Sequence, residues 1–151
     1  RRKAIMSTSW RPNGHNFAPE YQVSGWPFVK TVTGVNTTAQ KIEFPHVTRW
    51  FSISVHADAH RAVRIGFTEN GVDDTTGDGC YFLVETDEKD AGGGGSNHSF
   101  KSNVFEIKCK ELWFRTDSGN DTIISVIAGY TGILTGSFPV ITGSNGFEGV
   151  G

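Results

Sequence analysis

Residues 47–56 read Val47-Thr48-Arg49-Trp50-Phe51-Ser52-Ile53-Ser54-Val55-His56, and this stretch decides the fold class. Phe51, Ile53 and Val55 alternate with Trp50, Ser52, Ser54 and His56. Successive side chains of a strand point to opposite faces of a sheet, so this period of two predicts a half-buried β-strand.

Similar short runs, separated by turn signals, occupy the chain on both sides of this stretch. Asn70-Gly71 is a strong turn dipeptide, and Pro45 ends a run because it cannot donate to a ladder. The run 122–130 is almost wholly apolar, which predicts a central strand covered on both faces. The predicted strands are 28–35, 40–44, 47–56, 62–67, 80–85, 103–109, a run through Leu112 and Phe114, and 122–130.

Eight short strands in one domain match a jelly-roll β-sandwich better than a seven-stranded immunoglobulin-type sandwich. The chain has 151 residues, enough for one domain with a core that needs no metal or disulfide. It has 19 Gly and 11 Phe but one Met, and no long apolar pattern with a helical period. We therefore predict an all-β, eight-stranded single jelly roll.

Two non-periodic segments flank the predicted jelly-roll domain, residues 27–130. Residues 1–26 read as an extended N-terminal arm, and residues 131–151 form a C-terminal tail rich in Gly and Ser. Polar arms of this kind are ordered only when something holds them. We expect the N-terminal arm to pack on its own domain or on neighbouring subunits. The tail, with Phe138 and Phe147 as apolar anchors, could lie along a partner's surface.

The charge of the chain is nearly balanced but unevenly distributed. A net charge of -2 gives no basic footprint for nucleic acid, and no apolar run reaches the roughly 18 residues of a membrane span. The start is basic, whereas residues 69–90 carry eight carboxylates against Lys89. Such a run is usually a solvated loop face; calcium binding and docking on a basic neighbour are the alternatives.

The most site-like cluster is His56-Ala57-Asp58-Ala59-His60. On a strand, positions 56, 58 and 60 share one face and could offer two imidazoles and a carboxylate to a metal. The cluster follows the end of the predicted strand, and no His follows His98 to complete a cupin-type metal set. We therefore expect a polar turn here.

The remaining chemical candidates are also incomplete. Asp73, Asp74 and Asp78 could supply oxygen ligands to calcium but do not have EF-hand spacing. Cys80 lacks a convincing His partner for nucleophilic catalysis; it and Cys109 lie in apolar contexts that favour buried thiols, and the sequence leaves open whether they pair. We assign no catalytic, cofactor-binding or metal-binding residue, expect no cofactor, and predict that the chain is not an enzyme.

Several stretches resemble the small single-jelly-roll capsid proteins of large icosahedral double-stranded DNA viruses, particularly the penton proteins of the five-fold vertices. They are SWRPNGHN at 9–16 with APEY at 18–21, RIGFTENGV at 64–72, EIKCKELWF at 106–114 and IAGYTGI at 127–133. The resemblance implies a structural virion protein that forms a homopentamer and contacts neighbouring major and minor capsid proteins. Localisation in the virion capsid would follow.

One other class of function fits the same sequence. A carbohydrate- or receptor-binding β-sandwich, such as a spike or fibre head or a carbohydrate-binding module, could use the four Trp residues as a stacking platform. Trp50 lies on the outward phase of its predicted strand, which is compatible with that alternative.

Overall fold

The computed structural model describes residues 26–74, 77–86, 98–119 and 121–151. Eight strands and one short helix, α1 (Glu69–Asp73), form this part of the chain together with two 3-10 turns, Thr135–Ser137 and Gly143–Asn145. The strands are β1 (Trp26–Val35), β2 (Gln40–Glu43), β3 (His46–Ala57), β4 (Ala62–Gly66), β5 (Phe82–Glu85), β6 (His98–Lys101), β7 (Glu111–Thr116) and β8 (Thr122–Leu134). Among these residues no helix is long and apolar enough to cross a membrane.

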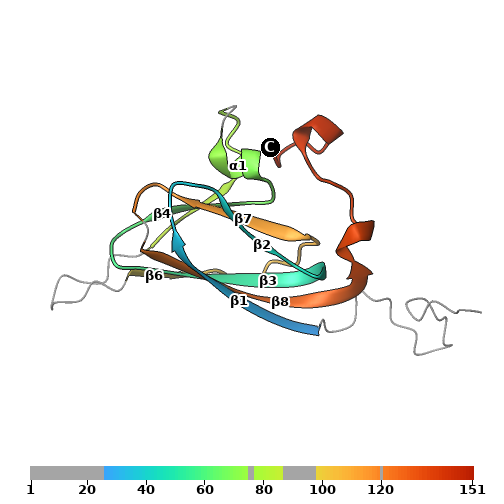
Figure 1. Cartoon of the computed structure of the whole chain (residues 1–151), viewed down its shortest axis with the longest axis horizontal. Helices are drawn as coiled ribbons and strands as arrows, with labels where there is room; N and C mark the ends of the chain where they lie inside the picture. The colour runs from blue at the N-terminus through green and yellow to red at the C-terminus, as the bar shows by residue number, and fades with distance from the viewer. Residues whose placement is uncertain (1–25, 75–76, 87–97, 120) are drawn as a thin grey trace, which may run out of the picture.

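The first strand pairs with the last, and successive strands pair in the same way towards the middle of the sequence, as in one long hairpin. β1 pairs with β8, β2 with β7, β3 with β6 and β4 with β5, all antiparallel. Two further ladders, β3 with β8 and β4 with β7, roll this long hairpin into two sheets. Their orders are β1-β8-β3-β6 and β2-β7-β4-β5, stacked as two layers in Figure 1. This is a jelly roll, and the predicted fold class is confirmed.

The core lies between the two sheets and follows the period-2 pattern of the sequence. The Phe51, Ile53 and Val55 side chains of β3 are almost fully buried, as are Leu112 and Phe114 of β7. Pairing places Phe28, Ala128 and Phe51 in one row across the first sheet. Burial of such apolar side chains is the main source of stability for a sandwich.

The sixth predicted strand is wrong in position. β6 is His98–Lys101, which lies outside every predicted strand, and the predicted run 103–109 makes only one isolated bridge within the described residues, between Phe105 and Phe51. Residues 102–109 still run beside β3, but their register slips by one residue between the Ser54–Lys101 pair and the Phe51–Phe105 bridge. A slip of this kind is a β-bulge, which interrupts the regular ladder.

The expected turn at Asn70-Gly71 is also wrong, because both residues lie in α1. Thr68 caps the helix with a hydroxyl that accepts a hydrogen bond from the Gly71 N–H at 3.0 Å. Asp74 ends the helix in the left-handed conformation, at φ 54°. Capping by Thr68 thus favours one helical turn over a hairpin turn.

The C-terminal segment rises from β8, in one layer, to α1 on the outer side of the other layer (Figure 1). β8 itself continues to Leu134, four residues past the predicted boundary at residue 130. The Thr68 hydroxyl donates to the Val150 carbonyl, and the Gly143 N–H donates to Gly151 O at 2.8 Å. The end of the tail thus lies on its own domain. The predicted N-terminal arm falls outside the described residues, apart from Trp26.

Candidate functional site

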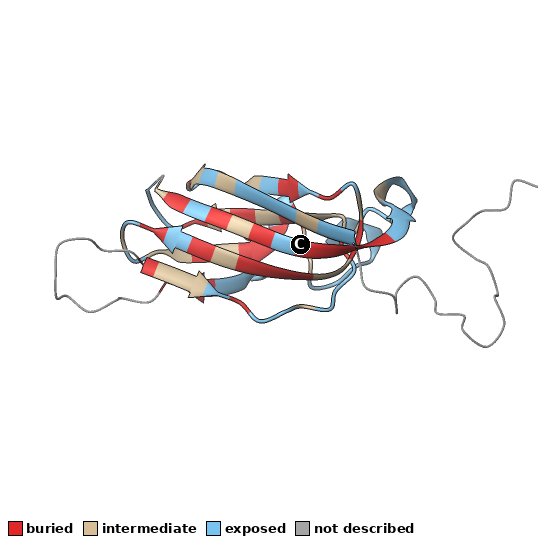
Figure 2. Ribbon diagram, turned by 90° about the horizontal axis from the view of Figure 1, so that it is seen from below, coloured by how far each residue is buried: buried red, intermediate tan, exposed pale blue. Residues whose placement is uncertain are grey.

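The outward side chains of the β1-β8-β3-β6 sheet form a surface that we call the open face. Figure 2 views the molecule from this side, with exposed and buried residues alternating along the strands. Strand register arranges the open face in rows that cross the sheet: Pro27, Gly129 and Trp50; Val29, Ile127 and Ser52; Thr31, Ser125, Ser54 and Lys101; Ile123, His56 and Ser99.

The open face is apolar at its centre and nearly free of charge. Val29 is 68% exposed, Ile127 47% and Ile123 37%. Lys101 is the one residue in these rows with a formal charge at pH 7, and none carries a carboxylate. The prediction that β8 is covered on both faces is therefore wrong for the single chain within the described residues. Exposed apolar surface with a polar surround is typical of an interaction site.

Short side chains keep the open face smooth. A Cβ atom at Gly129 would lie 2.7 Å from Cε2 of Trp50, so the indole of Trp50 lies directly over this glycine. The Thr31 and Ser125 hydroxyls share a hydrogen bond at 2.9 Å, and Ser54 Oγ bonds His56 Nε2 at 3.2 Å. Polar groups that already hydrogen-bond one another cost less free energy to bury, because fewer of their hydrogen bonds to water are lost.

The outer face of the β2-β7-β4-β5 sheet has the opposite character. Lys41 forms ion pairs with Glu43 and Glu111, and its ammonium lies 5.3 Å from the ring centre of Trp113. The hydrogen bond from Lys41, helped by its charge, lowers the pKa of Glu43. The guanidinium groups of Arg64 and Arg115 donate to carbonyls of α1. This face is charged and partly covered by the chain itself.

The His56, Asp58 and His60 side chains, considered above as a metal set, do not form one. His56 and Asp58 are exposed, and the His60 ring stands edge-on to His98 with 6.5 Å between ring centres. In the described ranges no three His, Cys, Asp or Glu side chains come close enough together to hold a metal ion. That region of the structure therefore gives no support to a cupin-type centre.

The three aspartates considered for calcium take structural roles or stay apart. The Asp73 carboxylate pairs with Arg115 at 3.4 Å, and Asp74 Oδ1 accepts a hydrogen bond from the Gly79 N–H at 2.9 Å. Asp78 is exposed. Part of the acidic segment, residues 75–76 and 87–90, lies outside the described residues.

The two cysteines do not pair with each other. Cys109 is fully buried, and its Sγ lies 3.3 Å from the Thr48 hydroxyl. Burial raises the pKa of the Cys109 thiol to about 12, and the hydrogen bond between this thiol and the Thr48 side chain acts in the opposite direction. A thiol with so high a pKa is inert at neutral pH. Cys80 is partly exposed.

The described tryptophans lie on three separate surfaces. Trp26 is 67% exposed at one end of the sandwich, beside His46. Trp50 lies on the open face and Trp113 on the outer face of the other sheet. Trp10 is outside the described residues. A stacking platform built from several tryptophans is therefore not formed by the three.

The open face was missed as a site in the sequence, although a signal for it was present. Ile123 and Ile127 sit on the opposite phase of β8 from Ile124 and Val126, so both phases are apolar. A strand with this pattern needs a cover on each side.

Comparison of the chain with protein-family models, with curated proteins and with solved structures finds no match.

Proposed function

We propose that the chain is a structural capsid subunit of an icosahedral virus, a penton-type single jelly roll that forms a ring of five. In this proposal it occupies the vertex and contacts neighbouring major and minor capsid proteins. The jelly-roll strand order is compatible with such a role. The sequence resemblance at 9–16, 18–21, 64–72, 106–114 and 127–133 supplies the specific class. Because a fold alone does not imply a function, the proposal rests on the chemical character of the molecular surface.

The contrast between the two outer faces carries this proposal. One face is charged and partly covered by α1, whereas the open face exposes Val29, Ile123 and Ile127 with no carboxylate in its rows. Interface centres are depleted in charge relative to the rest of a protein surface. We infer that the open face is covered by a second copy of the chain in the assembled ring.

In a closed ring each subunit contacts its two neighbours through two different surfaces, and the same pair of surfaces meets at every contact. The open face supplies one of them. The proposal assigns no catalytic residue and no cofactor, and function resides in shape and association. The alternative of a sugar-binding sandwich receives no support from the placement of Trp26, Trp50 and Trp113 on separate surfaces.

The mass of the full chain under native conditions tests the proposal. We expect a pentamer for the natural chain and a monomer for Ile127→Glu, because the new charge would be buried without a partner. Leu83→Glu is the matched control: Leu83 is 48% exposed, against 47% for Ile127, but lies on the β4-β5 side. The control should remain pentameric.

A natural chain that stays monomeric at every concentration, or forms a trimer, would contradict the proposal. Retention of the pentamer by Ile127→Glu would remove the open face as the contact. Circular dichroism of each variant checks that the fold is retained, which we expect because exposed substitutions usually change stability by under about 0.5 kcal/mol.

A further inference from the structure

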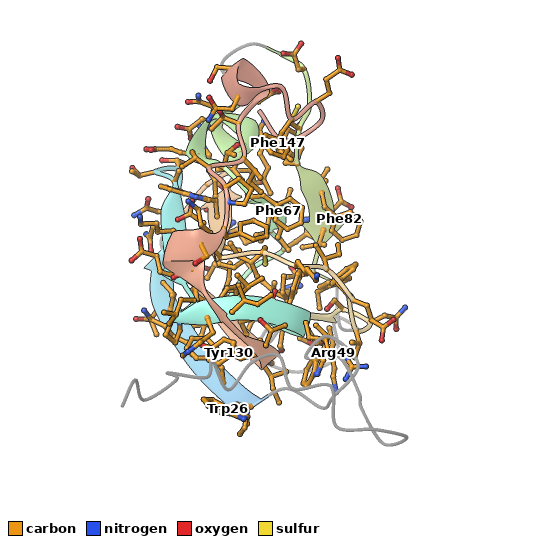
Figure 3. The ribbon with its side chains drawn as sticks, turned by 90° about the vertical axis from the view of Figure 1, so that its right-hand side faces the viewer. Trp26, Arg49, Phe67, Phe82, Tyr130 and Phe147 are labelled. Atoms are coloured by element: carbon orange, nitrogen blue, oxygen red, sulfur yellow. The ribbon has the colours of Figure 1, made fainter. Side chains whose placement is uncertain are left out.

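A pocket of about 370 Å³ opens between the two sheets on the side of β5 and residues 102–109. Phe51 and Ile53 of β3 contribute from one sheet, and Ile65 of β4 and Leu112 of β7 from the other. The remaining lining residues are Gly66, Phe67, Gly79, Cys80, Tyr81, Phe82, Phe105, Ile107 and Gly149. Figure 3 labels two of them, Phe67 and Phe82.

The interrupted pairing of residues 102–109 explains why the sandwich is open here. After Lys101 the regular ladder with β3 gives way to separate contacts. The Ser102 N–H donates to the Ile53 carbonyl at 2.9 Å, and Phe105 forms an isolated bridge with Phe51. Phe105 stands edge-on to Phe82, with 6.0 Å between ring centres, and Ile107 is 40% exposed. Three glycines in the lining add no side chain to fill the space.

The lining is neutral and almost entirely hydrocarbon. Among the described lining residues no side chain carries a charge, and the Cys80 thiol and Tyr81 hydroxyl are the only polar side-chain groups. The nearby guanidinium of Arg64 stacks over the Tyr81 ring at 4.5 Å and donates to the Val72 carbonyl at 3.1 Å. It is therefore already engaged by the protein's own groups.

We propose that this pocket binds a neutral, mostly hydrocarbon small molecule such as a long-chain alcohol or an unsubstituted aromatic. Its size falls in the roughly 300–1,000 Å³ range of ligand pockets, which are mostly apolar with a few polar groups. The pocket is open to solvent, so an apolar ligand would remove exposed lining side chains such as Phe82 and Ile107 from water. A carboxylate would lose its hydration with no cation to replace it. This inference does not depend on the proposed capsid role.

The neutral dye N-phenyl-1-naphthylamine tests the site by fluorescence titration of the full chain. We expect saturable binding of one dye per chain. Cys80→Trp, which fills the pocket, should weaken binding at least about tenfold. Ser137→Trp adds the same side chain at an exposed position of the tail and should bind like the natural chain. Absence of saturable binding, or equal binding by both variants, would overturn the proposal.

Thiol labelling of the natural chain gives a second test that needs no folded variant. Saturating 1-decanol should slow maleimide labelling of Cys80 several-fold, whereas decanoate of equal chain length should protect less. Cys109, fully buried outside this lining, reports any general unfolding. Equal or stronger protection by decanoate would overturn the assignment of a neutral ligand.

Discussion

Thr48 and Cys109 join a regular strand to an irregular segment through backbone and side chain together. The Thr48 N–H donates to the Cys109 carbonyl at 3.0 Å, and the Cys109 N–H donates to Thr48 Oγ1 at 3.0 Å. The same hydroxyl donates to the Ile107 carbonyl at 2.8 Å. Where the register of residues 102–109 has slipped, the Thr48 hydroxyl thus accepts the hydrogen bond that a backbone carbonyl accepts in a regular ladder.

Thr48→Val should lower the free energy of unfolding by about 1–3 kcal/mol, because it leaves the buried Cys109 N–H and the Ile107 carbonyl without this partner. Urea denaturation measures the change. Thr31→Val is the control, since its hydroxyl bonds Ser125 on the exposed open face. Equal effects of the two substitutions would contradict the role of Thr48.

Cys109 should make stability depend on alkaline pH. Burial raises its thiol pKa from 9.0 to about 12, so the folded chain holds this proton more tightly than the unfolded chain. The contribution of this proton to the free energy of unfolding is fully present below pH 9. It is lost as pH rises towards 12, by up to about 1.4 kcal/mol per pH unit. Urea titrations of the natural chain and of Cys109→Ala across this range should converge as pH rises. A constant difference between them would contradict the raised pKa.

Gly71→Ala should release the end of the tail from α1. A Cβ atom at Gly71 would lie 2.6 Å from the Val150 carbonyl and 2.7 Å from the Cys80 carbonyl, both backbone atoms. Hydrogen exchange of the backbone amide of Gly143, which bonds Gly151, should become faster. Gly136→Ala is the matched control, because a Cβ there meets nothing within 4 Å. Unchanged exchange in Gly71→Ala would show that the tail is held elsewhere.

Tyr130→Phe should leave the free energy of unfolding unchanged or raise it by about 1 kcal/mol. The buried Tyr130 hydroxyl has no hydrogen-bond partner within the described residues, and burial raises its pKa. An unbonded polar group costs free energy when buried. Thermal and urea denaturation measure the effect. A loss of more than about 1 kcal/mol would indicate a partner for this hydroxyl.

The period-2 pattern predicted the fold class and most of the core correctly. Phe51, Ile53 and Val55 were recognised as one face of a strand, and they are buried together. The pattern failed at residues 103–109, where Cys109 is buried but Ile107 is 40% exposed. A bulge changes which side chains share a face, and the period-2 pattern does not show that this slip lies between Lys101 and Phe105.

The candidate site could be predicted only in part. Both apolar phases of β8 are visible in the sequence, so the need for two covers could be read directly. Which phase the second sheet covers depends on pairing between residues far apart in the chain, such as Ile127 with Val29 and Ser52. The charged face opposite is likewise defined by the β2-β7 and β4-β7 ladders.

The all-β class and the side chains that alternate along the regular strands, such as β3, follow from local periodicity and turn chemistry, so the sequence was enough to predict them. Tertiary structure alone decided the jelly-roll pairing, the slipped register beside β3, the exposure of Val29, Ile123 and Ile127, and the pocket between the sheets. A strand's pattern states which residues share a face, but only long-range pairing and packing determine what covers that face.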